Sequence, residues 1–296
     1  MKLRLGVRGM MWLTLVIMMW GIISCRTQEE KCLEEVLSLP LANKEELQKV
    51  LDHYKDDSLK YQAVCFLIRN MPFHAGYEGN ALKHYYQYFD IYAQGKLGPH
   101  EVIDSLKENS FSVSQLKRIE DIANIDSSLL VQNVDWAFKV WREQPWGKNV
   151  SFDNFCEFVL PYRLGDEPLG FWREDIYKRY NPILDSIRLL PQAQDPLVAA
   201  KVLMDSLVVE QSHFTGLFPA GPHLGPSVVS WRAGSCREFA DLVVYVMRAL
   251  GIPCGTDYMA MRGDNNVPHF WNFTLDKDGK TYITEFPDPN WKRAVI

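Results

Sequence analysis

A cysteine near the C-terminal end of the chain has the type and the setting needed for nucleophilic chemistry. Cys236 follows Gly234 and Ser235 and opens a run whose apolar residues recur at steps of three and four, as on one face of an amphipathic helix. The free N–H groups and the dipole at a helix N-terminus stabilise a thiolate, which is the nucleophilic form of cysteine. Cys236 is therefore a candidate nucleophile for attack on a carbonyl carbon, provided that a base lies nearby.

His269 is the candidate base. It lies in residues 267–275, an aromatic and β-prone segment that predicts a strand. Residues 276–280 read Asp-Lys-Asp-Gly-Lys and predict a turn, and residues 281–286 predict a returning strand. A nucleophile on a helix, a base on one strand and an acid on the next strand are the three groups that thiol acyl transfer uses.

Two acids, Glu285 and Asp288, are candidates for the third group. If residues 277–279 form a three-residue hairpin loop with a left-handed glycine at its end, Glu285 lies opposite Trp271 and on the same face as His269. If the last two of those residues form a two-residue loop instead, Asp288 lies opposite His269. A slip of one residue changes the face of every side chain, so the turn decides which acid can contact the imidazole.

These motifs resemble the transglutaminase-like core, a papain-like cysteine fold. The resemblance covers about residues 227–290 and is carried by Gly-Ser-Cys opening a helix that ends in Arg-Ala-Leu-Gly-Ile-Pro, by His-Phe-Trp-Asn, and by Asp-Gly-Lys before an acid. It implies Cys236 as nucleophile and His269 as base. The family usually has aspartate as the third group, and its spacing from the turn glycine favours Glu285 over Asp288 here.

The resemblance implies covalent chemistry on amides, with water as acceptor in a protease, amidase or deamidase and an amine as acceptor in crosslinking. We expect a monomeric surface protein that hydrolyses peptides or glycopeptides and needs no metal or organic cofactor. The alternative is a non-catalytic module of the same fold that binds peptide or glycan. The backbone N–H of Cys236 is one candidate oxyanion donor. Candidates for the second donor are Trp231, Gln211, Gln194 and Tyr162, and Trp271 either shields the Cys–His pair from water or packs in the core.

A second segment resembles a stretch found ahead of the core in a group of bacterial transglutaminase-like lipoproteins. The resemblance extends over about residues 45–180 and includes Tyr162 and Arg163, which follow a proline. The planar fork of Arg163 suits a substrate carboxylate. The structural alternative is that Arg163 pairs with Asp166 or Glu167 and fixes the loop.

Residues 1–24 have the pattern of an export signal. Basic residues precede an apolar stretch of fourteen residues, which is shorter than the roughly 20 that a transmembrane helix needs. The sequence Ile-Ile-Ser-Cys that ends at Cys25 resembles a bacterial lipobox, which implies a lipid on Cys25 and anchoring to a membrane. Ordinary secretion and an uncleaved anchor are the alternatives. We expect the mature protein in the bacterial cell envelope, on the periplasmic face or the cell surface.

The overall composition argues against two classes of partner. The net charge of −5 and the lack of basic clusters interleaved with aromatic residues give no reason to expect nucleic acid. No histidines and cysteines have metal-ligand spacing, so we expect no metal site. The remaining cysteines, whose disulfide pairing the sequence does not determine, are Cys32, Cys65, Cys156 and Cys254.

We expect an α+β fold in which a helical N-terminal region precedes a core with the nucleophile helix packed on an antiparallel sheet. The expected division is a lipoprotein signal peptide (1–24), a helical region (25–150) and a transglutaminase-like domain (151–296). Residues 114–121 are among the segments that we expect to be helical.

Overall fold

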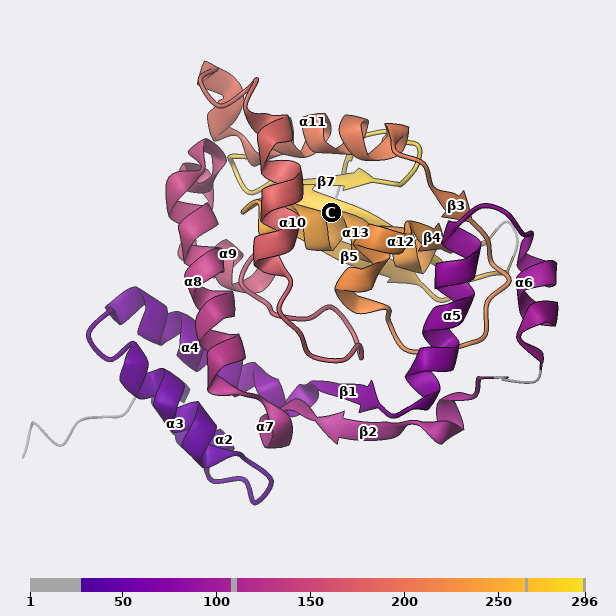
Figure 1. Cartoon of the computed structure of the whole chain (residues 1–296). Helices are drawn as coiled ribbons and strands as arrows, with labels where there is room; N and C mark the ends of the chain where they lie inside the picture. Colours follow the sequence, from indigo (N-terminus) through magenta and orange to yellow (C-terminus); the bar gives the residue numbers. More distant parts are fainter. Residues whose placement is uncertain (1–27, 108–110, 264–265, 295–296) are drawn as a thin grey trace, which may run out of the picture.

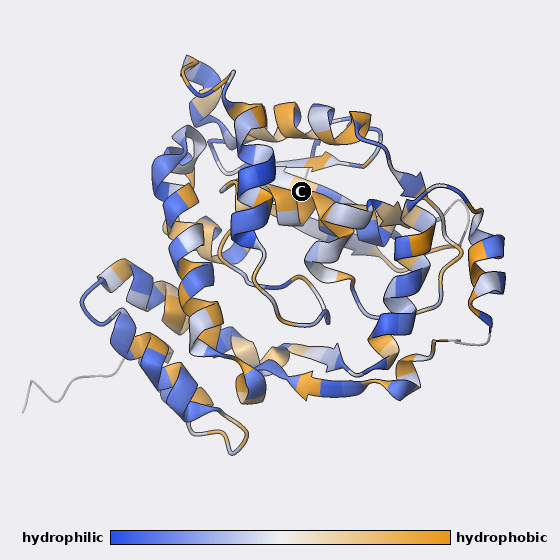
Figure 2. Ribbon diagram, in the orientation of Figure 1, coloured by the Kyte–Doolittle hydropathy of each residue, from blue (hydrophilic) through white to orange (hydrophobic). Residues whose placement is uncertain are grey.

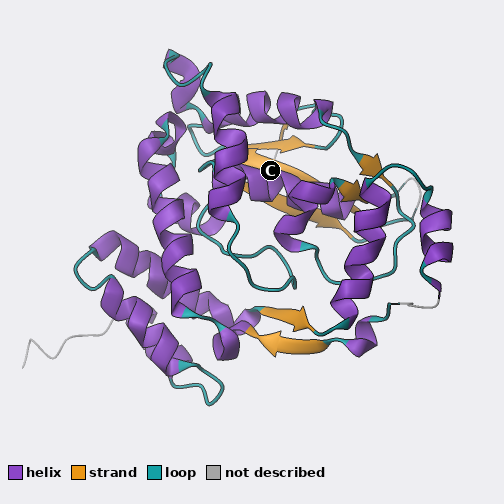
Figure 3. Cartoon of the chain, in the orientation of Figure 1, coloured by secondary structure: helices purple, strands orange, loops and turns teal. Residues whose placement is uncertain are grey.

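The computed structural model describes residues 28–107, 111–263 and 266–294, so the predicted signal peptide and Cys25 lie outside the described residues. The chain is a mixed α+β protein in which helices predominate and the sheets are small (Figure 3). The helices are α2 (Gln28–Leu37), α3 (Lys44–His53), α4 (Ser58–Asn70), α5 (Ala81–Ala93), α6 (Pro99–Ser105), α7 (Asp121–Asn124), α8 (Ser127–Glu143), α9 (Phe152–Phe158), α10 (Arg173–Tyr180), α11 (Pro196–Val209), α12 (Val228–Trp231) and α13 (Cys236–Ala249).

The strands form three separate sheets. They are β1 (Ala75–Glu78), β2 (Lys117–Glu120), β3 (His213–Phe214), β4 (Ala233–Gly234), β5 (Cys254–Met259), β6 (His269–Leu275), β7 (Thr281–Thr284) and β8 (Lys292–Arg293). Strands β1 and β2 pair antiparallel, β3 and β4 pair parallel, and the remaining four form an antiparallel sheet in the order β5-β6-β7-β8. Figure 1 shows the two-stranded β1–β2 sheet well away from the four-stranded sheet.

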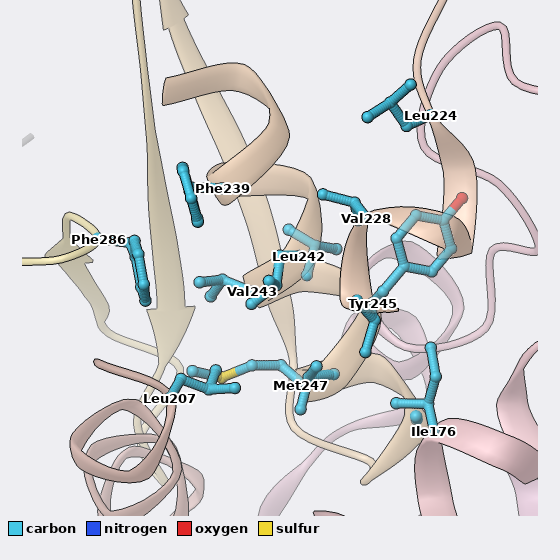
Figure 4. Packing of buried hydrophobic residues seen from close by; sticks show 14 of the residues in the cluster. Ile176, Leu207, Leu224, Val228, Phe239, Leu242, Val243, Tyr245, Met247 and Phe286 are labelled. Carbon is cyan, nitrogen blue, oxygen red and sulfur yellow. The ribbon is translucent and has the colours of Figure 1, made fainter. Parts of the chain in front are cut away.

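Helix α13 is the centre of the larger hydrophobic cluster. It contacts β5 and β6 of the four-stranded sheet and also packs against α10 and α12. Its apolar residues are almost fully buried, and the ring of Phe239 stacks on that of Phe286 with centroids 4.7 Å apart (Figure 4). Figure 2 shows apolar residues along both α13 and α11, whose Leu207 belongs to the same cluster. Each such side chain contributes about 1.5–3 kcal/mol by its burial, so packing fixes the start of α13 against the sheet.

The two hydrophobic clusters are drawn from alternating parts of the chain. One contains α2, α3, α4, α8 and α9, and the other contains α5, α6 and most elements from α10 onward. Helices α5 and α6 therefore pack with C-terminal elements, whereas α9 packs with N-terminal ones. The domain division at residue 150 stays a prediction, and the hydrophobic clusters draw on both sides of it.

The expectation of a helix over residues 114–121 is wrong. A short 3₁₀ turn (Val113–Gln115) is followed there by β2, which pairs with β1 in the register Ala75↔Glu120. The apolar spacing of a segment reports only local periodicity. A partner strand some forty residues away supplies hydrogen bonds that this local pattern does not reveal.

Candidate functional site

Cys236 is the first residue of α13, and the residues beside it define the helix start. The Ser235 hydroxyl caps the helix by accepting the Arg237 N–H at 3.3 Å. The Glu238 carboxylate accepts the Ser235 N–H at 2.8 Å and its hydroxyl at 2.7 Å, which completes a capping box. The Cys236 N–H has no hydrogen-bond partner among the described residues, as expected in the first turn of a helix. A free backbone donor therefore accompanies the thiol.

The Cys236 thiol belongs to the wall of a cavity of about 490 Å³. One wall is formed by the segment from Phe214 to Ala220, and the other by Val267, Pro268 and Phe270. Parallel pairing of β3 with β4 sets Phe214 opposite Gly234, two residues before the cysteine. The cavity is thus lined by aromatic and proline rings together with the polar residues at the start of α13.

Arg237 ties one wall of this cavity to the helix. Its guanidinium pairs with Glu238 at 2.7 Å, donates to the Gly221 carbonyl at 3.0 Å and donates to the Tyr85 hydroxyl at 3.3 Å. Arg237 thereby balances the buried charge of the capping carboxylate. It also holds the loop that carries the wall residues close to the first turn of α13.

The hairpin between β6 and β7 has the turn that places Glu285 beside His269. Gly279 is left-handed (φ 74°), and the Asp276 N–H donates to the Lys280 carbonyl at 2.9 Å. The register pairs Asn272 with Thr284, so the turn is the three-residue loop, one of the two alternatives that the sequence left open. Continued by one residue, this register sets Glu285 opposite Trp271.

The side chains of His269 and Glu285 lie close together. His269 Nε2 lies 2.8 Å from Glu285 Oε1, with 15% of the histidine side chain exposed and 52% of the glutamate side chain exposed. The Nε2 atom itself is buried and not aligned for a hydrogen bond with any described residue, so this contact is electrostatic. Asp288 is exposed and forms no ion pair within the described part of the chain. Of the two candidate acids, the structure brings Glu285 to the imidazole.

Cys236 lines the cavity itself, whereas only the chain neighbours of His269 do so. Asn272 donates to the Ala240 carbonyl of α13 at 3.0 Å, so the alternation along β6 puts Asn272 and Phe270 on the face toward this helix. His269, at the first position of β6, shares the other face with Trp271. Its neighbours Pro268 and Phe270 line the cavity of Cys236, but no hydrogen bond joins the described thiol and imidazole.

Comparison of the chain with protein-family models, with curated proteins and with solved structures finds no match. The site is therefore interpreted from its own geometry. Within residues 28–107, 111–263 and 266–294, no group of three or more His, Cys, Asp and Glu side chains is arranged to hold a metal ion. The same residues contain no helix that is long and apolar enough to span a membrane.

The two predicted tryptophans pack near the cavity but are not among its lining residues. Trp231 lies 5.2 Å from Tyr86 and 5.9 Å from Phe89 by ring centroids, and its ring is part of the aromatic packing. Trp271 lies 5.8 Å from the ring of His269. Its indole N–H is buried without a hydrogen-bond partner among the described residues, which makes it a better candidate than Trp231 for a donor beside the imidazole.

Tyr162 and Arg163 are buried and engaged within the protein. The Tyr162 hydroxyl donates to Asp121 at 2.8 Å, and Arg163 Nε lies 3.0 Å from the same carboxylate. Arg163 also donates to the Glu167 carbonyl at 2.8 Å. These contacts favour the structural alternative over substrate binding. The expected ion-pair partner was wrong, because Asp121 takes that place.

The carboxylate of Glu167 is used elsewhere in the same loop. It accepts the Leu164 N–H at 2.7 Å, the Gly165 N–H at 2.8 Å and the Tyr245 hydroxyl at 2.6 Å. Burial raises the pKa of Glu167, but these hydrogen bonds and the charge of Arg163 outweigh it and lower the pKa. The loop is therefore held by a buried, ionised acid.

A second histidine–carboxylate pair was not predicted. His223 Nδ1 donates to Asp241 Oδ2 at 2.7 Å, and both residues line a cavity of about 370 Å³. Burial lowers the pKa of His223, but the charge and hydrogen bond of Asp241 outweigh it and raise the pKa to about 9. The available sequence signal was Asp241 itself, a carboxylate within an otherwise strongly apolar stretch of helix.

Proposed function

We propose that this chain is a thiol enzyme that acts on peptide or glycopeptide amides through Cys236, His269 and Glu285. The observation that carries the proposal is the position of Cys236. Its thiol lies at the first residue of a capped helix, beside an unpartnered backbone N–H, in a cavity of about 490 Å³. Such a position stabilises both a thiolate and the oxyanion that forms when it attacks a carbonyl.

The proposed reaction has two steps. The Cys236 thiolate attacks the amide carbonyl carbon, the C–N bond breaks, and the amine or ammonia leaves with a proton from His269. Water, deprotonated by His269, then attacks the thioester and releases the acid and the thiolate; an amine as acceptor gives a new amide instead. Glu285, 2.8 Å from the imidazole, stabilises its protonated form.

The surroundings of α13 support a transglutaminase-like core within this proposal. A helix that begins at the candidate nucleophile packs on an antiparallel sheet, and the candidate base and acid lie on adjacent strands of that sheet. We place the protein in the bacterial cell envelope, held by a lipid on Cys25. That assignment depends on the sequence of residues 1–25 alone.

One observation favours a second function, a non-catalytic module that binds peptide or glycan. The thiol and the imidazole form no hydrogen bond among the described residues, and β6 presents His269 on the face away from α13. The enzyme requires a local movement at the start of β6 that brings the two groups together, since catalytic hydrogen bonds can tighten when substrate binds. The binding module requires no such movement.

Site-resolved alkylation distinguishes the two functions. The full chain is treated with iodoacetamide between pH 5 and 9, and each cysteine is followed by mass spectrometry. For the enzyme we expect Cys236 to react rapidly below pH 7 and His269→Ala to slow it by about 10-fold or more at pH 6, because the imidazolium no longer stabilises the thiolate. Cys254 is the internal reference, because it is fully buried and burial raises its pKa to about 12.

A Cys236 thiol with an ordinary titration that is unaffected by His269→Ala would exclude the enzyme. The binding module would then be the better description of the site. Circular dichroism of the His269→Ala variant controls for loss of fold.

A further inference from the structure

The cavity of Cys236 is the first of three that adjoin one another. Phe270 lines both this cavity and the second, of about 370 Å³, which contains His223 and Asp241. Leu164 and Arg248 line both the second cavity and a third of about 290 Å³. The three cavities thus share lining residues one with the next, and the second cavity borders β5.

Arg248 lies where the second and third cavities meet, and part of its guanidinium is unused. The side chain is buried, with 8% of the residue exposed. Its Nε donates to the Phe158 carbonyl at 3.1 Å and its Nη1 to the Arg163 carbonyl at 3.3 Å. Its Nη2 has no hydrogen-bond partner, and no carboxylate pairs with it, among the residues that the structure describes. Glu167 and Asp241 act on this guanidinium only through space, so a ligand carboxylate in direct contact with Nη2 would be stabilised by a charged hydrogen bond.

His223 offers a second unused donor in the same cavity. Its Nδ1 is taken by Asp241, and its Nε2 forms no hydrogen bond with any described residue. The charges around it are Asp241 and Glu167, which raise its pKa, and Arg237, which lowers it. Asp166 accepts the His223 backbone N–H at 2.8 Å, and Glu157 lies exposed at the rim of the cavity. Since the pKa is raised to about 9, the ring is protonated at neutral pH and Nε2 carries a proton to donate.

The charged side chains that line the second cavity are Arg248 and His223 on the positive side and Asp241 and Glu157 on the negative side. Asp241 is paired with His223, and Glu157 lies exposed. Within the described residues, Arg248 therefore has no carboxylate paired directly with it. A single carboxylate would pair with this guanidinium, whereas a phosphate dianion would bring one negative charge too many.

We propose that the second cavity binds the carboxylate of an acidic peptide between Arg248 Nη2 and His223 Nε2. The ligand is an Asp or Glu side chain, or a C-terminal carboxylate, within a few residues of the amide that lies over Cys236. The choice of a peptide as ligand rests on the proposed function, but the carboxylate contact does not involve the thiol. The site therefore selects acidic peptides among the substrates that the first cavity can hold.

The test uses the full chain carrying Cys236→Ser, which cannot turn over substrate. Fluorescence polarisation measures binding of a labelled Ala-Ala-Glu-Ala-Ala peptide and of its Gln-containing analogue. We expect the Glu peptide to bind about 10-fold more tightly, because a charged hydrogen bond is lost in the analogue. His223→Gln removes most of this difference, and raising the pH from 7 to 10 does the same without any substitution in the subsite, as His223 loses its proton.

Three results would overturn the proposal. Equal affinity for the two peptides, or a Glu preference that neither His223→Gln nor pH changes, removes the subsite. If free acetate displaces the peptide at concentrations close to the dissociation constant of the peptide, the site binds simple anions. The assignment of a peptide as ligand is then wrong. Arg248→Gln is a poorer test because its two carbonyl contacts also hold the fold, and the pH series does not depend on it.

These results separate the subsite from the proposed function. A sluggish Cys236 in the alkylation experiment, together with a retained Glu preference, excludes the enzyme and leaves the subsite. If the wild-type protein hydrolyses neutral and acidic peptides at equal rates, the enzyme is supported and the subsite is excluded.

Discussion

Two histidine–carboxylate pairs among the described residues have nearly the same separation and very different surroundings. His269 Nε2 lies 2.8 Å from Glu285, and His223 Nδ1 lies 2.7 Å from Asp241. The side chain of Glu285 is 52% exposed, whereas that of Asp241 is 4% exposed. Water screens the first pair, while the second interacts through a low dielectric, where the same charges attract much more strongly. The buried Asp241 carboxylate holds His223 in its charged form and raises the pKa of this histidine to about 9.

Asp241→Asn is the substitution expected to have the largest effect on this comparison. The folded-state pKa of His223 is about 9, above its ordinary value of 6.5, so its protonation stabilises the fold fully below pH 6.5 and this contribution is lost as the pH rises through 9. The shift corresponds to about 2–3 kcal/mol after allowance for partial exposure. Urea unfolding of the wild type at pH 6 and pH 10 should show this difference, and the variant should lack it.

The matched control is Glu285→Gln measured over the same pH range. An Asp241→Asn variant that keeps the wild-type slope of stability with pH, or a His223 ring that still titrates near pH 9 by NMR, would show that Asp241 does not hold the proton.

Gly165→Ala tests the buried pair from outside it and should have an intermediate effect. A Cβ at this position would lie 2.3 Å from Cδ2 and 2.7 Å from Nε2 of the His223 ring, so the ring must move. We expect a loss of about 1–3 kcal/mol in the free energy of unfolding, as for other overpacked sites. Gly170→Ala is the control, because nothing lies within 4 Å of its added Cβ. A variant at position 165 that is as stable as this control would contradict the close contact.

Glu285→Gln should have the smallest effect on stability. Because more than half of the carboxylate side chain is exposed, we expect a change of less than about 0.5 kcal/mol in the free energy of unfolding. A loss above roughly 1 kcal/mol would mean that this pair is as strongly coupled as the buried one, and the contrast between the two would disappear. Chemical denaturation at pH 7 in low salt, where surface ion pairs contribute most, provides the measurement.

The exposed pair could be predicted from sequence because every step was local. A left-handed glycine fixed the turn, the turn fixed the register, and the register placed Glu285 on the face of His269. The start of α13 was equally legible, since a serine cap and a glutamate three residues later define a helix end on their own.

The buried pair could not be found in the same way. His223 comes from an irregular loop whose path is set by Arg237, through its bonds to the Gly221 carbonyl and the Tyr85 hydroxyl. Tyr85 lies far away in the sequence, so no local pattern places the loop against Asp241. Strand β2 was missed for the same reason, because its partner β1 also lies outside the local sequence. Whether Cys236 and His269 form a hydrogen bond depends likewise on how β6 crosses α13. The periodicity of apolar residues in the sequence does not specify this crossing.

The bonds of Arg237 limit how the thiol cavity can open. The guanidinium links Gly221, which follows the wall segment that ends at Ala220, to the first turn of α13, which contains Cys236. This wall and the sulfur therefore move together. Any movement that widens the cavity for a bulky chain therefore falls to the opposite wall, where Pro268 precedes β6 and Phe270 is the second residue of this strand. His269 lies between these two residues in the chain. The movement that admits a substrate would therefore also move the imidazole relative to the sulfur.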